Sequence, residues 1–202
     1  EPEGEGVRVD SGVYEGGEVS MHYDPMISKL ITYGDNRTEA IDRMVDALDA
    51  YYIRGVNHNI SFLNALMVHP RFVAGELTTN FIAEEFPDGF NADLVPQNDP
   101  AVAVVVAASV HQEYRERSAL ISGQTGGQQY DVPCDWVVIA SDTETSVTTV
   151  LSEQGFIVSI GDKDYEVSTD WALGEPLFQA SINGRSVCVQ VARNGSEYKL
   201  FY

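Results

Sequence analysis

The side chains most able to do chemistry are four histidines and two cysteines, which can ligate a metal ion or act as bases and nucleophiles. They are His22, His58, His69, His111, Cys134 and Cys188. A zinc site needs such ligands in pairs a few residues apart, and none of the six has a partner at that spacing. The glycine pairs at 16–17 and 126–127 indicate turns, because neither precedes an expected helix as a phosphate-binding loop does. The sequence therefore predicts no catalytic and no metal-ligating residue.

The charge balance narrows the kinds of partner. The 202 residues carry 31 acidic and 12 basic side chains, so the formal net charge is −19. A nucleic-acid surface needs clustered lysine and arginine, and anionic membranes attract basic segments, so we expect no nucleic acid and no membrane as a partner. The two widely spaced cysteines are typical of free thiols in a reducing compartment. We therefore expect a cytoplasmic protein, or one of the mitochondrial matrix in a eukaryote.

The second half is organised around a helix expected from Asp99 to Arg117. Asp99 can cap the helix, Pro100 suits its first position, and Arg115 and Arg117 favour its C-terminal end. Residues 101–110 are almost all alanine and valine, so such a helix must be covered on every side. The alternative is a buried strand, because valine is β-branched, but the length and the end signals favour a helix. The apolar run is only about half of the ~20 residues that a membrane span needs.

Seven short strands are expected after this helix. They lie at 130–140, 146–151, 156–160, 165–171, 177–182, 186–192 and 197–202. The Asn-Gly pairs at 183–184 and 194–195 are typical of tight hairpin turns, because both residue types tolerate positive φ. Alternating valines in the sixth strand leave one apolar face, as in an antiparallel sheet packed on a core. Such a sheet and an all-apolar helix cover each other if the sheet curls around the helix.

The first half mixes strands with amphipathic helices. We expect strand structure within 1–35, with a strand at 26–33, and helices at 36–54, 60–69 and 81–86, the first ending at Gly55. Residues 87–93 are acidic and punctuated by proline and glycine, which indicates a domain boundary. The chain also begins at Glu1 rather than methionine, so we expect it to be a piece of a longer protein.

One segment carries a specific family resemblance. Residues 6–31 closely resemble the C-terminal lobe of biotin carboxylase, and the likeness continues through Gly34-Asp35-Asn36-Arg37 and Thr79-Asn80-Phe81-Ile82, covering roughly 4–86. The segment Glu15-Gly16-Gly17-Glu18-Val19-Ser20-Met21 is most similar to the α subunits of biotin-dependent acyl-CoA carboxylases that act on propionyl-CoA. Those that act on methylcrotonyl-CoA are the nearest alternative.

The resemblance implies an α+β fold of two parts. Residues 1–88 would be the C-terminal α/β lobe of biotin carboxylase. Residues 92–202 would be a BT domain, which is a long central helix surrounded by an antiparallel β-barrel. We expect this second domain to be truncated at its C-terminal end. In the family this domain docks the α subunit onto a carboxyltransferase β subunit through a hook between the helix and the first strand. Leu120, Ile121 and Tyr130 are therefore the expected docking residues.

The resemblance also implies a two-step reaction for the complete enzyme. Biotin carboxylase uses ATP, Mg²⁺ and bicarbonate to carboxylate biotin on the carrier domain of the same α subunit, and the β subunit passes the carboxylate to an acyl-CoA. Phe81 matches a position at the edge of the adenine pocket, although a packing role in its helix fits equally well. Neither the ATP-grasp residues nor an Ala-Met-Lys-Met biotinylation motif occurs in this sequence. We expect this chain alone to bind no cofactor and to be inactive.

Two alternatives remain open from the sequence. The acyl-CoA can be methylcrotonyl-CoA or another substrate rather than propionyl-CoA, since the β subunit of the family selects it. Outside enzymes, the second half can be an independent β-barrel that binds a ligand or a protein. A helix filling the barrel would exclude the ligand-binding alternative, because it leaves no cavity.

Overall fold

The computed structural model describes residues 1–17, 19, 22, 25–91, 99–120, 131–140 and 142–202. The chain divides into two compact units, Glu1–Pro96 and Gln97–Tyr202. In the part of the chain that is described, no helix combines the length and the hydropathy needed to cross a bilayer.

The first unit places a short two-stranded sheet beside four helices. Its elements are β1 (Val7–Ser11), β2 (Ser28–Thr32), α1 (Arg37–Asp49), α2 (Ile60–Val68), α3 (Pro70–Ala74) and α4 (Phe81–Glu85). The strands are antiparallel, with Val7 opposite Thr32 and Ser11 opposite Ser28. The side chain of Asn36 caps α1 by accepting a hydrogen bond from the Glu39 amide at 3.0 Å. The predicted strand and helices of this half are therefore present.

Helix α1 is shorter than the sequence predicts. It ends at Asp49, and the Ala50 amide closes its last turn on the carbonyls of Asp46 and Leu48. The chain then turns so that Tyr51 is buried, and its hydroxyl pairs with the Ser28 hydroxyl of β2 at 2.6 Å. Continuing the helix would remove Tyr51 from this position. The prediction that α1 reaches Gly55 was therefore wrong, and tertiary packing explains the difference.

The second unit is one helix followed by seven strands. Its elements are α5 (Pro100–Ala119), β3 (Asp135–Ala140), β4 (Thr143–Ser152), β5 (Gly155–Ile160), β6 (Lys163–Ser168), β7 (Leu177–Ile182), β8 (Arg185–Asn194) and β9 (Glu197–Phe201). The strands form a single antiparallel meander in chain order. The Asn-Gly pair at 183–184 forms the β7–β8 turn with positive φ at both residues. The β8–β9 turn lies one residue later than predicted, because Asn194 pairs with Glu197.

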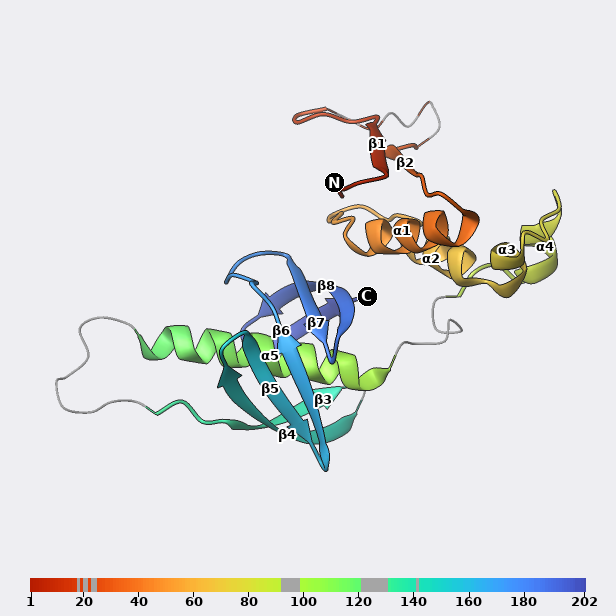
Figure 1. Ribbon diagram of the computed structural model, residues 1–202. Helices are drawn as coiled ribbons and strands as arrows, with labels where there is room; N and C mark the ends of the chain where they lie inside the picture. The colour runs from red at the N-terminus through yellow and green to blue at the C-terminus, as the bar shows by residue number, and fades with distance from the viewer. Residues whose placement is uncertain (18, 20–21, 23–24, 92–98, 121–130, 141) are drawn as a thin grey trace. The chain divides into compact units, whose positions relative to one another are not determined.

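The sheet curls around α5 as a half-barrel (Figure 1). Strands β6 and β7 pair only at Val167–Ile182 and Ser168–Ser181, so the sheet bends sharply between them. Helix α5 runs through the curl, with β3, β4 and β5 on one side and β7 and β8 on the other. Among the described residues, β3 and β9 are the two edge strands of the sheet. The α+β fold with a long helix enclosed by an antiparallel sheet is thus confirmed.

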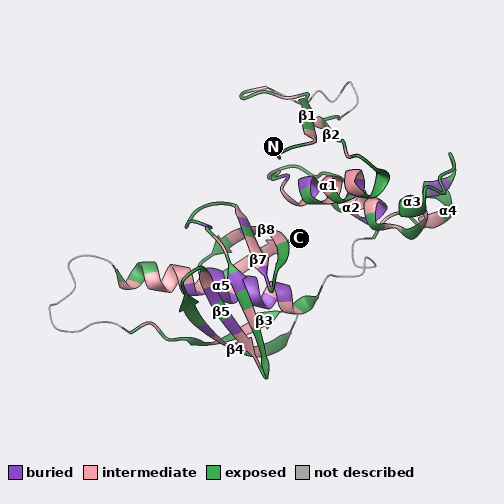
Figure 2. Ribbon diagram, viewed as in Figure 1, coloured by how far each residue is buried: buried purple, intermediate pink, exposed green. Residues whose placement is uncertain are grey.

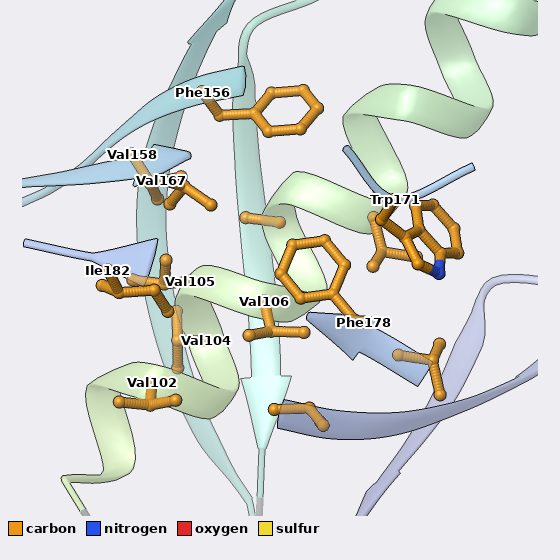
Figure 3. Packing of buried hydrophobic residues seen from close by; sticks show 14 of the residues in the cluster. Val102, Val104, Val105, Val106, Phe156, Val158, Val167, Trp171, Phe178 and Ile182 are labelled. Atoms are coloured by element: carbon orange, nitrogen blue, oxygen red, sulfur yellow. The ribbon is translucent and has the colours of Figure 1, made fainter. Parts of the chain in front are cut away.

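The core of this unit lies between the helix and the inner face of the sheet. Helix residues on every side are buried, namely Val102, Val104, Val105, Val106, Ala108, Ser109, Val110 and Gln112. They pack against Phe156 and Val158 of β5, Val167 of β6, and Phe178 of β7 (Figure 3). Because each buried valine contributes roughly 1.5–3 kcal/mol through burial of its side chain, this contact holds α5 in place. Side chains fill the centre, so the structure argues against a hollow ligand-binding barrel.

Candidate functional site

The predicted docking segment begins where α5 leaves the half-barrel. The helix is buried through Gln112, half-buried from Glu113 to Glu116, and exposed at Arg117 and Ser118, a change visible along α5 in Figure 2. Leu120 follows as the C-terminal cap, and its amide bonds to the Arg117 and Ser118 carbonyls. Its side chain is 77% exposed.

Leu120 thus presents an apolar side chain to solvent from a rigid support. Exposed apolar side chains near the end of a well-anchored element are candidates for contact with a partner. The other two predicted docking residues, Ile121 and Tyr130, lie outside the described residues. Their role stays a prediction.

Polar side chains fix the partly buried stretch of α5 to the sheet. The Trp136 indole of β3 donates a hydrogen bond to Gln112 Oε1 at 2.8 Å, and the Gln112 amide donates to Glu116 at 2.7 Å. Gln112 is buried, so both halves of its amide need partners. This arrangement sets the rotation of α5 relative to β3 and hence the direction in which the helix leaves the sheet.

A cluster of aromatic and basic side chains lies where the two edges of the sheet meet α5. His111 contacts the Trp136 ring of β3 at 4.5 Å between ring centres, and its Nδ1 lies 3.0 Å from the Tyr198 hydroxyl of β9. We call His111, Trp136 and Tyr198 the seam cluster. Arg193 of β8 lies beside it and stacks over the Tyr114 ring at 3.9 Å.

The electrostatics of the seam cluster favour a neutral His111. Burial, together with the neighbouring cations Arg115 and Arg193, lowers the pKa of His111 below its ordinary value. Burial also raises the pKa of Tyr198. Sequence reasoning missed this cluster. The one available signal was a histidine and a glutamine placed directly after an uninterrupted apolar helical run.

Phe81, the predicted residue of an adenine pocket, lies in the core of the first unit. Its side chain is 5% exposed, the His69 ring meets it edge-on at 5.2 Å, and the Arg71 guanidinium lies over its ring at 5.3 Å. Arg71 in turn pairs with Glu84 at 3.0 Å and with Glu85. These contacts hold α4 against α3.

The charges around Phe81 form a connected group. His69 Nε2 lies 3.2 Å from Glu85, the same carboxylate that Arg71 binds. The hydrogen bond from Arg71 is the main reason that the pKa of Glu85 is lowered. The packing role of Phe81 is therefore directly visible, and its contact with adenine stays a prediction.

A half-buried carboxylate marks the end of α1. Asp49 accepts a hydrogen bond from Asn64 of α2 at 2.8 Å. Burial, opposed by this hydrogen bond and assisted by the nearby Asp46, raises the pKa of Asp49 to about 6. The residue joins α1 to α2 at the cost of keeping a negative charge partly out of water.

No metal centre forms among the residues that the structure describes. No group of three or more histidine, cysteine, aspartate or glutamate side chains is placed there to hold an ion. Cys134 is exposed and Cys188 partly buried, and the structure joins neither in a disulfide. The described site therefore consists of the anchored helix α5, the exposed apolar side chain of Leu120 at its end, and the seam cluster.

Two family matches cover most of the chain. Residues 1–84 match the biotin carboxylase C-terminal domain, and residues 104–202 match the propionyl-coenzyme A carboxylase BT domain. Both matches fall within the two compact units of the structure.

Curated relatives match up to 98% of the chain. It is 38% identical over 201 residues to the propionyl-CoA carboxylase alpha chain of Ruegeria pomeroyi, which covers 98% of this chain and 30% of that protein. It is 37% identical over 190 residues to the mitochondrial propionyl-CoA carboxylase alpha chain of Homo sapiens, covering 92% and 26%. A methylcrotonoyl-CoA carboxylase subunit alpha of Dictyostelium discoideum is 39% identical over 113 residues, covering 56% and 16%. The chain therefore spans less than a third of the length of these relatives.

Proposed function

The chain belongs to the family of propionyl-CoA carboxylase alpha chains, and on that premise we propose that it joins biotin carboxylase to the carboxyltransferase β subunit. The first unit supplies the C-terminal lobe of biotin carboxylase, within 1–88. The second unit, within 92–202, is the docking domain. The observation that carries the proposal is the helix α5, which is anchored in a filled half-barrel and presents Leu120 to solvent.

The reaction proposed for the whole protein is the carboxylation of propionyl-CoA to methylmalonyl-CoA. ATP, with Mg²⁺, drives the joining of bicarbonate to biotin on the carrier domain of the same α chain, and the β subunit transfers the carboxylate to the α-carbon of the acyl-CoA. The methylcrotonyl-CoA alternative has less support, since the matched relative covers little more than half of this chain. The mouse and human relatives are named mitochondrial, which supports a matrix location if this chain is eukaryotic. For a chain of any other origin we propose the cytoplasm.

The residues of this chain do not fit biotin or ATP by themselves. The lysines are Lys29, Lys163 and Lys199, and none has the methionine neighbours of a biotinylation motif. In the part of the chain that the structure describes, no glycine-rich loop precedes a helix. We therefore assign both groups to other parts of the α chain and derive no chemical step from this one. The contribution of this chain is to bind and to position.

Native mass spectrometry tests the proposed docking. This chain is mixed with a propionyl-CoA carboxyltransferase β subunit, and complex formation is compared for the unaltered chain, Leu120→Asp and a deletion of 122–129. We expect a complex that both changes weaken at least tenfold, because a hot-spot side chain at the centre of an interface is worth about 2 kcal/mol or more and tenfold corresponds to about 1.4 kcal/mol. Val56→Asp is the matched control, since Val56 is 54% exposed in the other unit.

The result can also contradict the proposal. If the unaltered chain is folded and forms no complex, the docking role is wrong. If a complex forms and all three variants bind equally, docking occurs through a surface other than the end of α5.

A further inference from the structure

Two asparagines of the second unit are followed by glycine, the pairing in which asparagine loses its side-chain amide most readily. They are Asn183 and Asn194, and both are exposed at hairpin turns of the half-barrel. Glycine favours the reaction because it has no side chain to shield its backbone nitrogen from the preceding amide. By sequence the two sites are equivalent, and the structure distinguishes them.

Deamidation joins the asparagine side chain to the backbone nitrogen of the next residue. This nitrogen gives up its proton to solvent and attacks Cγ, and the bond between Cγ and Nδ2 breaks as Nδ2 takes up a proton and leaves as ammonia. Water then opens the resulting five-membered succinimide at either carbonyl, which gives aspartate or isoaspartate. An asparagine whose amide is hydrogen-bonded elsewhere must first break those bonds.

The Asn183 side chain is held at both of its polar atoms. Its Oδ1 accepts a hydrogen bond from the Glu166 amide at 2.8 Å, and its Nδ2 donates to the Asp164 carbonyl at 3.4 Å. The backbone amide of Asn183 also donates to the Glu166 carbonyl at 2.9 Å. These bonds attach the β7–β8 turn to β6, beyond the short ladder that joins β6 to β7. Ring closure at Asn183 would have to break the two side-chain bonds.

The Asn194 side chain has no such restraint. It lies at the end of β8, and its amide makes no hydrogen bond to any residue that the structure describes. Gly195 opens the two-residue turn with φ of 65°, and its N–H likewise has no partner among the described residues. The Arg193 guanidinium donates to the Gly195 carbonyl at 2.7 Å. This contact holds the turn and leaves the attacking nitrogen open.

We propose that Asn194 is a site of spontaneous deamidation and that Asn183 is protected by its bonds to β6. The product, aspartate or isoaspartate at position 194, adds a negative charge directly beside Arg193. Isoaspartate also lengthens the main chain by one bond in a turn of only two residues. Arg193 lies over the Tyr114 ring at 3.9 Å, so the new charge is placed where β8 contacts α5.

Peptide mapping of the intact chain measures both sites in one sample. The folded chain is kept at pH 7.5 and 37 °C and then cleaved with trypsin, which leaves Asn183 in peptide 164–185 and Asn194 in peptide 194–199 as the single asparagine of each. Mass spectrometry measures the converted fraction, and a sample taken at time zero corrects for conversion during cleavage. We expect peptide 194–199 to be converted at least about tenfold faster, because the two side-chain hydrogen bonds of Asn183 together are worth that factor or more.

Unfolding and a pair of variants separate protection by the fold from the effect of local sequence. In the urea-unfolded chain the two peptides should be converted at similar rates. Asn194→Gln keeps an amide that cannot close a five-membered ring, so the folded variant should release less ammonia than the unaltered chain. Asn57→Gln is the matched control, since Asn57 is an exposed asparagine of the other unit followed by histidine, and it should release as much as the unaltered chain.

Three results would overturn the proposal. The first is conversion of peptide 164–185 in the folded chain as fast as that of peptide 194–199. The second is no conversion of either peptide in the folded chain over the time in which the unfolded chain converts both. The third is a difference in rate that persists in urea, because it would then come from the local sequence and not from the bonds to β6.

Discussion

Thr149 offers a sharp test of how tightly the half-barrel is packed. It lies on the inner face of β4, its side chain is 1% exposed, and its hydroxyl has no hydrogen-bond partner among the described residues. A buried hydroxyl without a partner costs roughly 1–3 kcal/mol. Thr149→Val removes this cost and adds a methyl group worth at most about 0.8 kcal/mol. We expect the variant to stabilise the second unit by about 1–2 kcal/mol.

Tryptophan fluorescence makes the assay specific to that unit. Trp136 and Trp171 are the two tryptophans of the chain, and both lie in the second unit. Urea unfolding followed by their emission gives the free energy of unfolding of that unit alone. For a unit of about 100 residues, 1 kcal/mol corresponds to a rise in Tm of about 4–8 °C.

The neighbouring Thr148 provides the control for this experiment. Its hydroxyl donates a hydrogen bond to Asp135 at 2.7 Å on the outer face of the sheet. Thr148→Val therefore changes the strand propensity as Thr149→Val does, but it removes no buried hydroxyl that lacks a partner. We expect a change within about 0.5 kcal/mol. An unchanged or lower stability of Thr149→Val, or an equal gain in both variants, would show that the Thr149 hydroxyl is not a destabilising buried group.

Three further predictions concern the two cores. Ionisation of Asp49 should lower the free energy of unfolding of the first unit as the pH rises from about 4 to above 6, because burial raises its pKa to about 6. Hydrogen exchange in α1 should therefore show that Asp49→Asn is more stable than the unaltered chain by on the order of 2 kcal/mol at pH 7.5 and equally stable at pH 4. Phe178→Ala removes a fully buried ring and should lower the free energy of urea unfolding, followed by tryptophan fluorescence, by about 3–5 kcal/mol. Gly155 has φ of 144° and faces the Val167 carbonyl, so Gly155→Ala should cost more than about 1 kcal/mol in thermal unfolding.

Local sequence patterns predicted most of the second unit. The cap at Asp99 and Pro100 forms as expected, with Asp99 accepting from the Ala101 amide at 3.0 Å. The run of valines forms a helix despite its β-branched residues, because the helix can be buried on all sides by a sheet whose strands each have one apolar face. All seven strands lie close to their predicted places. These features depend on residues near one another in the chain, which is the information that periodicity carries.

The docking prediction could be placed only in part. The sequence located the segment after α5 by its position and by resemblance, and the structure adds that Leu120 is exposed beyond a buried helix. For Phe81, the sequence left a packing role and a pocket role equally open, and the contacts with His69 and Arg71 became visible only once α3 and α4 were placed together. The end of α1 likewise depended on the partner of Tyr51, which is 23 positions away.

The sequence by itself thus determined the order of elements, the apolar helix, the hairpin turns and the family, because each of these depends on nearby residues or on a continuous motif. Tertiary structure alone decided the seam cluster, the unpaired Thr149 hydroxyl and the raised pKa of Asp49. His111 and Tyr198 are 87 positions apart, and no local pattern records which distant side chain will meet a given residue. The charge state and the hydrogen bonds of a side chain depend on those distant neighbours, so they follow from the fold and not from the order of residues alone.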